Sequence, residues 1–196
     1  MANLYLIRHG RAAAGWDTAI DPPLDEHGRA QAAATALRLN EQLSSSSLRS
    51  DAVDVVTSPL LRCQETAAAF VTASGCVVRI EPRIAEIPSP VGVAVADRVT
   101  WLRRAMQGTW AELIASDGCA YHDFRDALID WATSVRVDTV AFSHFVAINA
   151  IIGVALNDDR LVIRSLDNAS ITHIEVGDDG SLTLREGGRE ADTLIR

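Results

Sequence analysis

Two histidines and two arginines of this sequence have the side-chain chemistry needed to bind and attack a phosphoryl group. Arg8 and His9 follow an apolar run and precede a glycine, which lets backbone amides approach a ligand closely. A guanidinium binds phosphoryl oxygens through charge-assisted hydrogen bonds, and an imidazole can attack phosphorus as a nucleophile. Taken alone, this stretch could equally be a strand end with a surface histidine. The later residues Arg62 and His144 therefore decide between the two interpretations.

These residues are expected at the ends of strands in one parallel sheet. Apolar runs predict strands at residues 4–7, 54–58, 76–80 and 139–143. With helices between them, the strands follow the alternating pattern that favours a parallel sheet with right-handed crossovers. Ligands bind beyond the carboxyl ends of strands in such sheets, so His9 and His144 are predicted at the same edge.

The helices next to the candidate residues have identifiable starts. Asp25 is the expected N-cap of a helix that carries small and apolar residues at helical spacing up to Leu43. A second helix is predicted to have Pro59 in its first turn, to carry Arg62 one turn further on, and to end near Gly75. Arg62 should therefore lie close to the carboxyl end of the second strand.

Residues 88–136 are predicted to form a helical insertion between the third strand and the strand that leads to His144. Two apolar patterns at helical spacing support a helix pair: Leu102, Met106, Trp110 and Leu113, then Tyr121, Phe124, Leu128, Trp131 and Val135. These stripes are expected to pack in the core, and the pair is expected to form part of the pocket. A helix at 145–152, strands at 160–166, 170–176 and 181–185, and a frayed tail over the last ten residues complete the prediction.

Composition excludes several classes of function. The net charge of −8 disfavours a nucleic-acid partner. All 18 basic residues are arginines, which excludes Schiff-base chemistry on lysine and a lysine-based phosphate loop. The three cysteines are scattered, which predicts reduced thiols rather than disulfides or a zinc site. No apolar run reaches membrane-spanning length and no basic leader precedes the first strand, so we expect a cytoplasmic protein with no membrane partner.

Four segments, at residues 6–10, 23–32, 57–67 and 143–144, occur in the order found in one known family. They read Leu-Ile-Arg-His-Gly, Pro-Leu-Asp-Glu-His-Gly-Arg-Ala-Gln-Ala, Thr-Ser-Pro-Leu-Leu-Arg-Cys-Gln-Glu-Thr-Ala and Ser-His. In combination they resemble the histidine phosphatase superfamily, the phosphoglycerate mutase-like phosphatases, over most of the chain. Residues 168–172 resemble the family's closing turn and strand. The resemblance implies an α/β fold of three layers, α/β/α, with a mostly parallel sheet and a single domain over residues 1–196.

The resemblance also implies roles for the histidines and arginines. His9 would be the nucleophile, which takes the phosphoryl group as a phosphohistidine that water later hydrolyses. Arg8, Arg62 and His144 would bind the phosphoryl oxygens, and this cage would replace a metal ion. We expect no cofactor, because no acidic cluster has the spacing of metal ligands.

A carboxylate after the third strand is implied as the general acid, which protonates the leaving alkoxide and then activates water. Glu81 and Glu86 both lie in that region. Glu86 has apolar neighbours and two nearby prolines, which favour a raised pKa, so we predict Glu86 as the acid. A solvated loop carboxylate is the alternative.

Four further residues are candidates for the pocket. Arg11 either contacts the substrate or is a solvated loop arginine. Ser58 either contacts phosphate or His144 or ends its strand, and Trp16 either caps the core or lines the pocket mouth. Phe145, where the family often has glycine, either lines the pocket or turns into the core. In the pocket, its ring would favour a substrate with an apolar or aromatic part.

The sequence thus predicts a metal-independent phosphomonoesterase that acts on a small phosphorylated molecule. No asparagine follows the Arg-His-Gly motif as it usually does in the mutases, which makes mutase activity less favoured. The alternatives are a phosphohistidine protein phosphatase and a phospho-ligand binding or regulatory module without turnover. The sequence leaves a monomer and a homodimer open.

Overall fold

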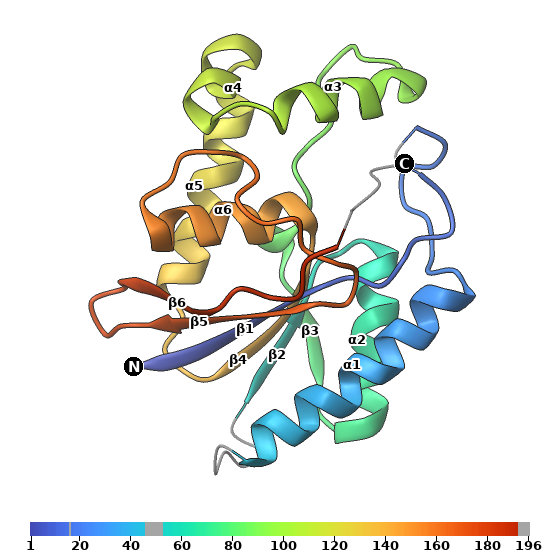
Figure 1. The fold of residues 1–196 in the computed structure, drawn as a ribbon, viewed down its shortest axis with the longest axis vertical. Helices are drawn as coiled ribbons and strands as arrows, with labels where there is room; N and C mark the ends of the chain where they lie inside the picture. Colours follow the sequence, from blue (N-terminus) through green and yellow to red (C-terminus); the bar gives the residue numbers. More distant parts are fainter. Residues whose placement is uncertain (16, 46–52, 192–196) are drawn as a thin grey trace.

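The computed structural model describes residues 1–15, 17–45 and 53–191, and at its centre is a six-stranded sheet (Figure 1). Four strands pair in parallel: β1 (Ala2–Arg8), β2 (Asp54–Thr57), β3 (Val78–Ile80) and β4 (Thr139–Ser143). Two more pair antiparallel, β5 (Ile171–Val176) with β1 and β6 (Leu182–Glu186) with β5. The order is β3-β2-β4-β1-β5-β6, so the predicted mostly parallel sheet is confirmed.

The two faces of the sheet carry separate apolar cores, because side chains alternate along each strand. In β1, Leu4 and Leu6 point to one core and Tyr5 and Ile7 to the other. Four helices cover these faces: α1 (Glu26–Ser45) and α2 (Leu61–Ser74) on one side, α5 (Cys119–Thr133) and α6 (Phe145–Leu156) on the other. This arrangement gives the three layers expected of the α/β fold.

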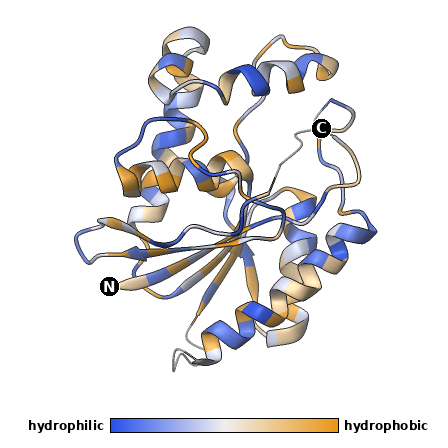
Figure 2. Cartoon of the chain, viewed as in Figure 1, coloured by the Kyte–Doolittle hydropathy of each residue, from blue (hydrophilic) through white to orange (hydrophobic). Residues whose placement is uncertain are grey.

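The α6 helix is apolar along most of its length, whereas α1 also carries many hydrophilic residues (Figure 2). The part of the chain that the structure describes contains no helix long and apolar enough to cross a membrane.

The starts of α1 and α2 illustrate a correct and an incorrect prediction. Asp25 caps α1, since its Oδ1 accepts a hydrogen bond of 2.7 Å from the backbone N–H of Gly28. The predicted start of α2 was wrong. Leu60 is extended and forms the N-cap, so Pro59 lies before the helix and Arg62 is its second residue. The helix does end at Gly75, whose φ of 75° is the left-handed conformation that glycine adopts readily.

Three α-helices, rather than the predicted two helices, lie between β3 and β4, together with two short 3-10 helices, η2 (Pro82–Ile84) and η3 (Val95–Asp97). The first apolar pattern is divided between α3 (Arg98–Ala105) and α4 (Trp110–Asp117). A capping box explains the break: Thr109 accepts from the backbone N–H of Glu112, and the Glu112 carboxylate accepts from the backbone N–H of Thr109. The apolar residues of α3, α4 and α5 still pack into one core.

The strand predicted at residues 160–166 is absent from the described chain. This segment makes only isolated bridges, from Arg160 to Thr109 and from Leu166 to Glu190. The side chain of Asn149 replaces a neighbouring strand, because its Oδ1 accepts from the backbone N–H groups of residues 163 and 164 and its Nδ2 donates to the carbonyl of residue 164. An apolar sequence pattern does not reveal such a side-chain partner.

The predicted frayed tail was also wrong over residues 187–191. Asp167 and Arg189 are joined by a backbone hydrogen bond of 2.8 Å and an ion pair of 2.6 Å. Ala191 donates to the carbonyl of Ser165 at 2.9 Å. This segment is therefore held against the loop that precedes β5. Residues 192–196 and the later part of the serine run at residues 44–47 lie outside the described residues.

Candidate active site

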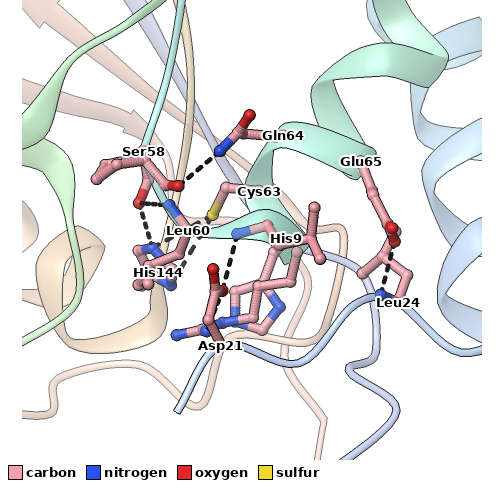
Figure 3. A network of polar contacts seen from close by, with 12 residues as sticks. His9, Asp21, Leu24, Ser58, Leu60, Cys63, Gln64, Glu65 and His144 are labelled. Carbon is pink, nitrogen blue, oxygen red and sulfur yellow. Dashed lines mark hydrogen bonds and ion pairs between the residues drawn. The ribbon is translucent and has the colours of Figure 1, made fainter.

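The sheet register brings the candidate residues together. Arg8 at the end of β1 pairs in register with Ser143 at the end of β4, and β2 ends beside β4. His9, His144 and Ser58 are the first residues after these three adjacent strands. Two backbone hydrogen bonds, from His9 to β4 at 3.0 Å and from Ser58 to β4 at 2.9 Å, fix the start of the loops. Figure 3 shows the three side chains around the beginning of α2.

The contacts of His9 determine which ring nitrogen has a lone pair. Nδ1 lies 2.7 Å from the carbonyl oxygen of Gly10, which can only accept, so Nδ1 carries the proton. The Nε–H of Arg62 donates to Nε2 at 3.2 Å. The lone pair of His9 is therefore on Nε2. Burial, together with the charges of Arg62 and Arg8, holds the pKa of His9 well below its usual range, so the ring is neutral near pH 7.

Arg62 contributes a guanidinium group that is buried but incompletely bonded. Its side chain is only 5% exposed, and Nη1 has no hydrogen-bond partner among the described residues. The nearest carboxylate oxygen, Oδ1 of Asp21, lies 3.8 Å from Nη1. A buried, unpaired guanidinium N–H costs free energy, so this atom is suited to an anionic ligand.

Arg8 is more firmly held than Arg62. Its Nη1 donates to the carbonyl of Leu166, and its guanidinium carbon lies 4.9 Å from the centre of the Phe145 ring. Burial lowers the pKa of Arg8 to about 10, although the charges of Glu86 and Asp167 act in the opposite direction. The group remains a cation at neutral pH beside the carboxyl end of β1.

His144 is fully buried at the N-cap of α6, and its ring centre lies 5.2 Å from that of His9. Nε2 of His144 is 2.7 Å from Oγ of Ser58 and 3.3 Å from Sγ of Cys63. Burial and the charge of Arg62 hold the pKa of His144 well below its usual range. The structure thus joins Ser58 to His144, one of the two alternatives considered for that serine.

The two candidate carboxylates have opposite environments. Glu81 accepts from Arg83 at 2.7 Å and pairs with Arg79 at 3.5 Å, and the hydrogen bonds from Arg83 lower its pKa. Burial raises the pKa of Glu86, against the effect of backbone N–H groups and of the charges of Arg62 and Arg8. Its Oε1 accepts from Ile87 at 3.0 Å. Glu86 is the carboxylate that shares the environment of the two arginines, whereas Glu81 is held in a separate ion-pair cluster.

Two of the remaining pocket candidates have contacts within the protein that account for their positions. Arg11 is half-exposed and pairs with Asp25 at 2.5 Å, so it is a solvated loop arginine that braces the start of α1. Phe145 is 4% exposed and belongs to the core, where it packs beneath Arg8. Of the two alternatives for Phe145, these contacts favour the one in which its ring turns into the core. Trp16 lies outside the described residues.

Several supporting residues were missed by the sequence analysis. Asp21 accepts from the backbone N–H of Leu61 at 2.8 Å and approaches Arg62. Asn168 donates to the backbone carbonyl of His9 at 3.1 Å, and Thr66 accepts from the N–H of Gly10 at 3.1 Å. Thr66 and Asn168 lie in segments that resemble the family, at residues 57–67 and 168–172, and this resemblance was the signal that could have found them.

The glycine after His9 is required by a close backbone approach. A Cβ at Gly10 would lie 2.4 Å from the carbonyl oxygen of Gly28, and a Cβ at Gly28 would lie 2.1 Å from the carbonyl oxygen of Arg11. The loop after β1 and the first turn of α1 can thus touch only because both positions lack a side chain.

Among the described residues, no group of three or more His, Cys, Asp or Glu could hold a metal ion.

Comparison with known proteins finds one family model that matches nearly the whole chain and a curated protein that matches part of it. A family model described as "Histidine phosphatase superfamily (branch 1)" matches residues 4–186. A curated protein of Photorhabdus laumondii, named probable phosphoglycerate mutase GpmB, is 27% identical over 121 residues, which cover 56% of this chain and 52% of that protein. The chain thus matches about half the length of this relative.

Two solved structures are similar in fold to almost the full length of this chain. Bacillus stearothermophilus YhfR has a TM-score of 0.72 at 19% identity, and the match covers 97% of this chain and 98% of that one. A mycobacterial glucosyl-3-phosphoglycerate phosphatase, in complex with inorganic phosphate, has a TM-score of 0.69 at 21% identity with the same coverage. At these identities the two structures establish the likeness of the fold.

Proposed function

The chain belongs to the histidine phosphatase superfamily, and we propose that it hydrolyses small phosphomonoesters through a phosphohistidine intermediate on His9, without a metal ion. The observation that carries this proposal is the state of the His9 ring. Its proton is directed to the carbonyl of Gly10, and its lone pair on Nε2 faces the Nε–H of Arg62. A neutral imidazole with its lone pair beside a buried cation is suited to attack on a bound phosphoryl group.

In the first step, Nε2 of His9 forms a bond to phosphorus while the ester P–O bond breaks. The leaving oxygen takes its proton from the carboxyl group of Glu86. Arg62 exchanges its contact with Nε2 for contacts with phosphoryl oxygens, for which Nη1 is already unpaired. Arg8 and His144 bind the remaining charge as it spreads over the equatorial oxygens.

In the second step, Glu86 is a carboxylate and takes a proton from water as that water attacks phosphorus. The N–P bond breaks, its electron pair returns to Nε2, and inorganic phosphate leaves. The raised pKa of Glu86 supports both roles, because a carboxyl group whose pKa is shifted towards neutrality can both donate and accept a proton.

The substrate class is a small phosphorylated molecule. The contacts of the Phe145 ring with Arg8 and the core account for its position without an apolar or aromatic substrate. Mutase activity is the second candidate, because the curated relative carries that name. The absence of an asparagine after the Arg-His-Gly motif favours hydrolysis.

Phosphate release from p-nitrophenyl phosphate tests the proposal. The wild-type protein should release phosphate in the presence of a metal chelator, and His9→Ala should abolish turnover. His122→Ala is the matched control, because His122 is half-exposed on α5 and should not affect the rate. Binding of phosphate without turnover would indicate a binding module. Phosphoryl transfer between the hydroxyl groups of a phosphoglycerate, without phosphate release, would indicate a mutase.

A further inference from the structure

The polar neighbours of His144 include two that can donate a proton. Oγ of Ser58 lies 2.7 Å from Nε2 of His144, and Sγ of Cys63 lies 3.3 Å from the same nitrogen. All three side chains are fully buried, so water does not compete for these contacts. The other ring nitrogen, Nδ1, has only one polar neighbour among the described residues, the sulfur of Cys63 at 3.8 Å.

The proton of each neighbour can be assigned from its remaining contacts. The thiol of Cys63 lies 3.3 Å from the carbonyl of Ser143, and only the S–H can donate in that pair. Burial raises the pKa of Cys63, so the thiol keeps its proton. Oγ of Ser58 accepts from the backbone N–H of Leu60 at 3.3 Å, which leaves its hydroxyl proton to be donated. The strongest acceptor in reach is Nε2 of His144.

We propose that Ser58 is a positioning residue, which donates its hydroxyl proton to Nε2 of His144 and so holds that ring as the Nδ1–H tautomer. This inference rests on the proposed function for its consequence, because the Nδ1–H group is then the donor offered to a phosphoryl oxygen. In the opposite tautomer, Nε2–H donates to Ser58, the hydroxyl proton is left with only a weak sulfur acceptor, and Nδ1 has a lone pair in place of the N–H that would donate to a phosphoryl oxygen. That arrangement lacks a donor for the ligand that the two arginines attract.

The tautomer can be measured in the ligand-free protein without any assay of activity. Long-range ¹H–¹⁵N spectra of selectively labelled histidine separate a protonated ring nitrogen from one with a lone pair. We expect Nδ1 of His144 to carry the proton in the wild-type protein at pH 7. A spectrum in which Nε2 carries the proton overturns the proposal whether or not the protein is a phosphatase.

Variants connect the tautomer to function. In Ser58→Ala, we expect the ¹⁵N shifts of His144 to change and kcat/KM for p-nitrophenyl phosphate to fall about tenfold or more, as for loss of one oriented donor. Ser58→Thr keeps the hydroxyl and should restore the wild-type tautomer. Cys63→Ala is the matched control, since it removes the other polar atom beside Nε2 and should leave the Nδ1–H tautomer in place.

The two proposals fail in different ways. If the spectra show the Nδ1–H tautomer but no variant or wild-type protein forms a phosphohistidine, the proposed function fails while the role of Ser58 in fixing the ring stands. If Ser58→Ala keeps both the wild-type ¹⁵N shifts and the wild-type kcat/KM, Ser58 is not a positioning residue and the phosphatase proposal is unaffected.

Discussion

Replacing Asp21 by asparagine should strengthen the binding of inorganic phosphate to this protein. The Asp21 carboxylate lies 3.8 Å from Nη1 of Arg62, the buried guanidinium atom that has no hydrogen bond among the described residues. A phosphoryl group bound to Arg62 must therefore compete with this carboxylate and is also repelled by it. The side-chain amide of Asp21→Asn would keep an oxygen that accepts from the N–H of Leu61, so the start of α2 should be preserved while the charge is removed.

The expected size of the effect follows from the distance and the exposure. Two unit charges about 4 Å apart interact by about 1 kcal/mol in water and about 4 kcal/mol at an effective dielectric constant of 20. The Asp21 side chain is 40% exposed, so the smaller value applies. A change of about 1 kcal/mol corresponds to a roughly fivefold lower inhibition constant for phosphate.

The assay is competitive inhibition of p-nitrophenyl phosphate hydrolysis by inorganic phosphate, at low and high salt. The gain in affinity of Asp21→Asn should shrink at high salt, because an exposed charge is screened. Asp123→Asn removes an exposed charge from α5 and controls for net charge. Unchanged or weaker inhibition by phosphate in Asp21→Asn, with the thermal stability retained, would refute the reasoning.

Substitutions at Glu86, His9 and Phe145 test other parts of the site. Glu86→Gln should lower kcat about 100-fold or more for alkyl phosphates, whose leaving group needs a proton, and much less for aryl phosphates with a good leaving group. Glu81→Gln is the control, because Glu81 lies in the separate ion-pair cluster, and it should keep kcat within about twofold. Equal losses in both variants would contradict the assignment of Glu86 as the general acid. The pKa of His9 is lowered in the folded protein, so below about pH 6.5 the unfolded chain binds a proton at this residue and the folded protein does not. The contribution of His9 to the free energy of unfolding is therefore fully present above that pH and is lost as the pH falls. Urea unfolding at pH 7.5 and 5.5 should show a smaller loss of stability for His9→Asn than for wild type, by up to about 1.4 kcal/mol in total, because only the pH unit below about 6.5 contributes. Equal losses in the two proteins would contradict the neutral ring. Phe145→Leu should lower stability by about 1–2 kcal/mol through lost packing and the lost contact with Arg8. The ratio of aryl to alkyl phosphate hydrolysis should not change, and a shift in that ratio would indicate that Phe145 lines the pocket.

Local patterns predicted much of the fold because the central strands of the sheet are buried on both faces. Continuous apolar runs located β1, β2 and β4, and the polar residues directly after them located His9, Ser58 and His144. The helix starting after Asp25 was predicted from its capping chemistry. The same chemistry, Thr109 with Glu112, was present in the insertion but was overlooked in favour of apolar periodicity, and α3 and α4 were predicted as one helix.

The remaining errors concern partners that are distant in sequence. Residues 160–166 are apolar enough for a strand, but the side chain of Asn149 satisfies part of their backbone instead. The environment of Glu86 could be inferred from its apolar neighbours, whereas the approach of Asp21 to Arg62 depends on a loop that returns to the start of α2. Such long-range contacts have no signature in local composition.

The central claim is that His9 forms a covalent phosphohistidine through Nε2. Rapid mixing of the protein with p-nitrophenyl [³²P]phosphate, followed by quenching in alkali, should trap a label that is stable to alkali and lost in acid. Peptide mapping should place that label on His9, and ³¹P NMR of the denatured adduct should show the Nε2-linked isomer. Multiple turnovers without a label on His9, or a label on any other residue, would contradict the account.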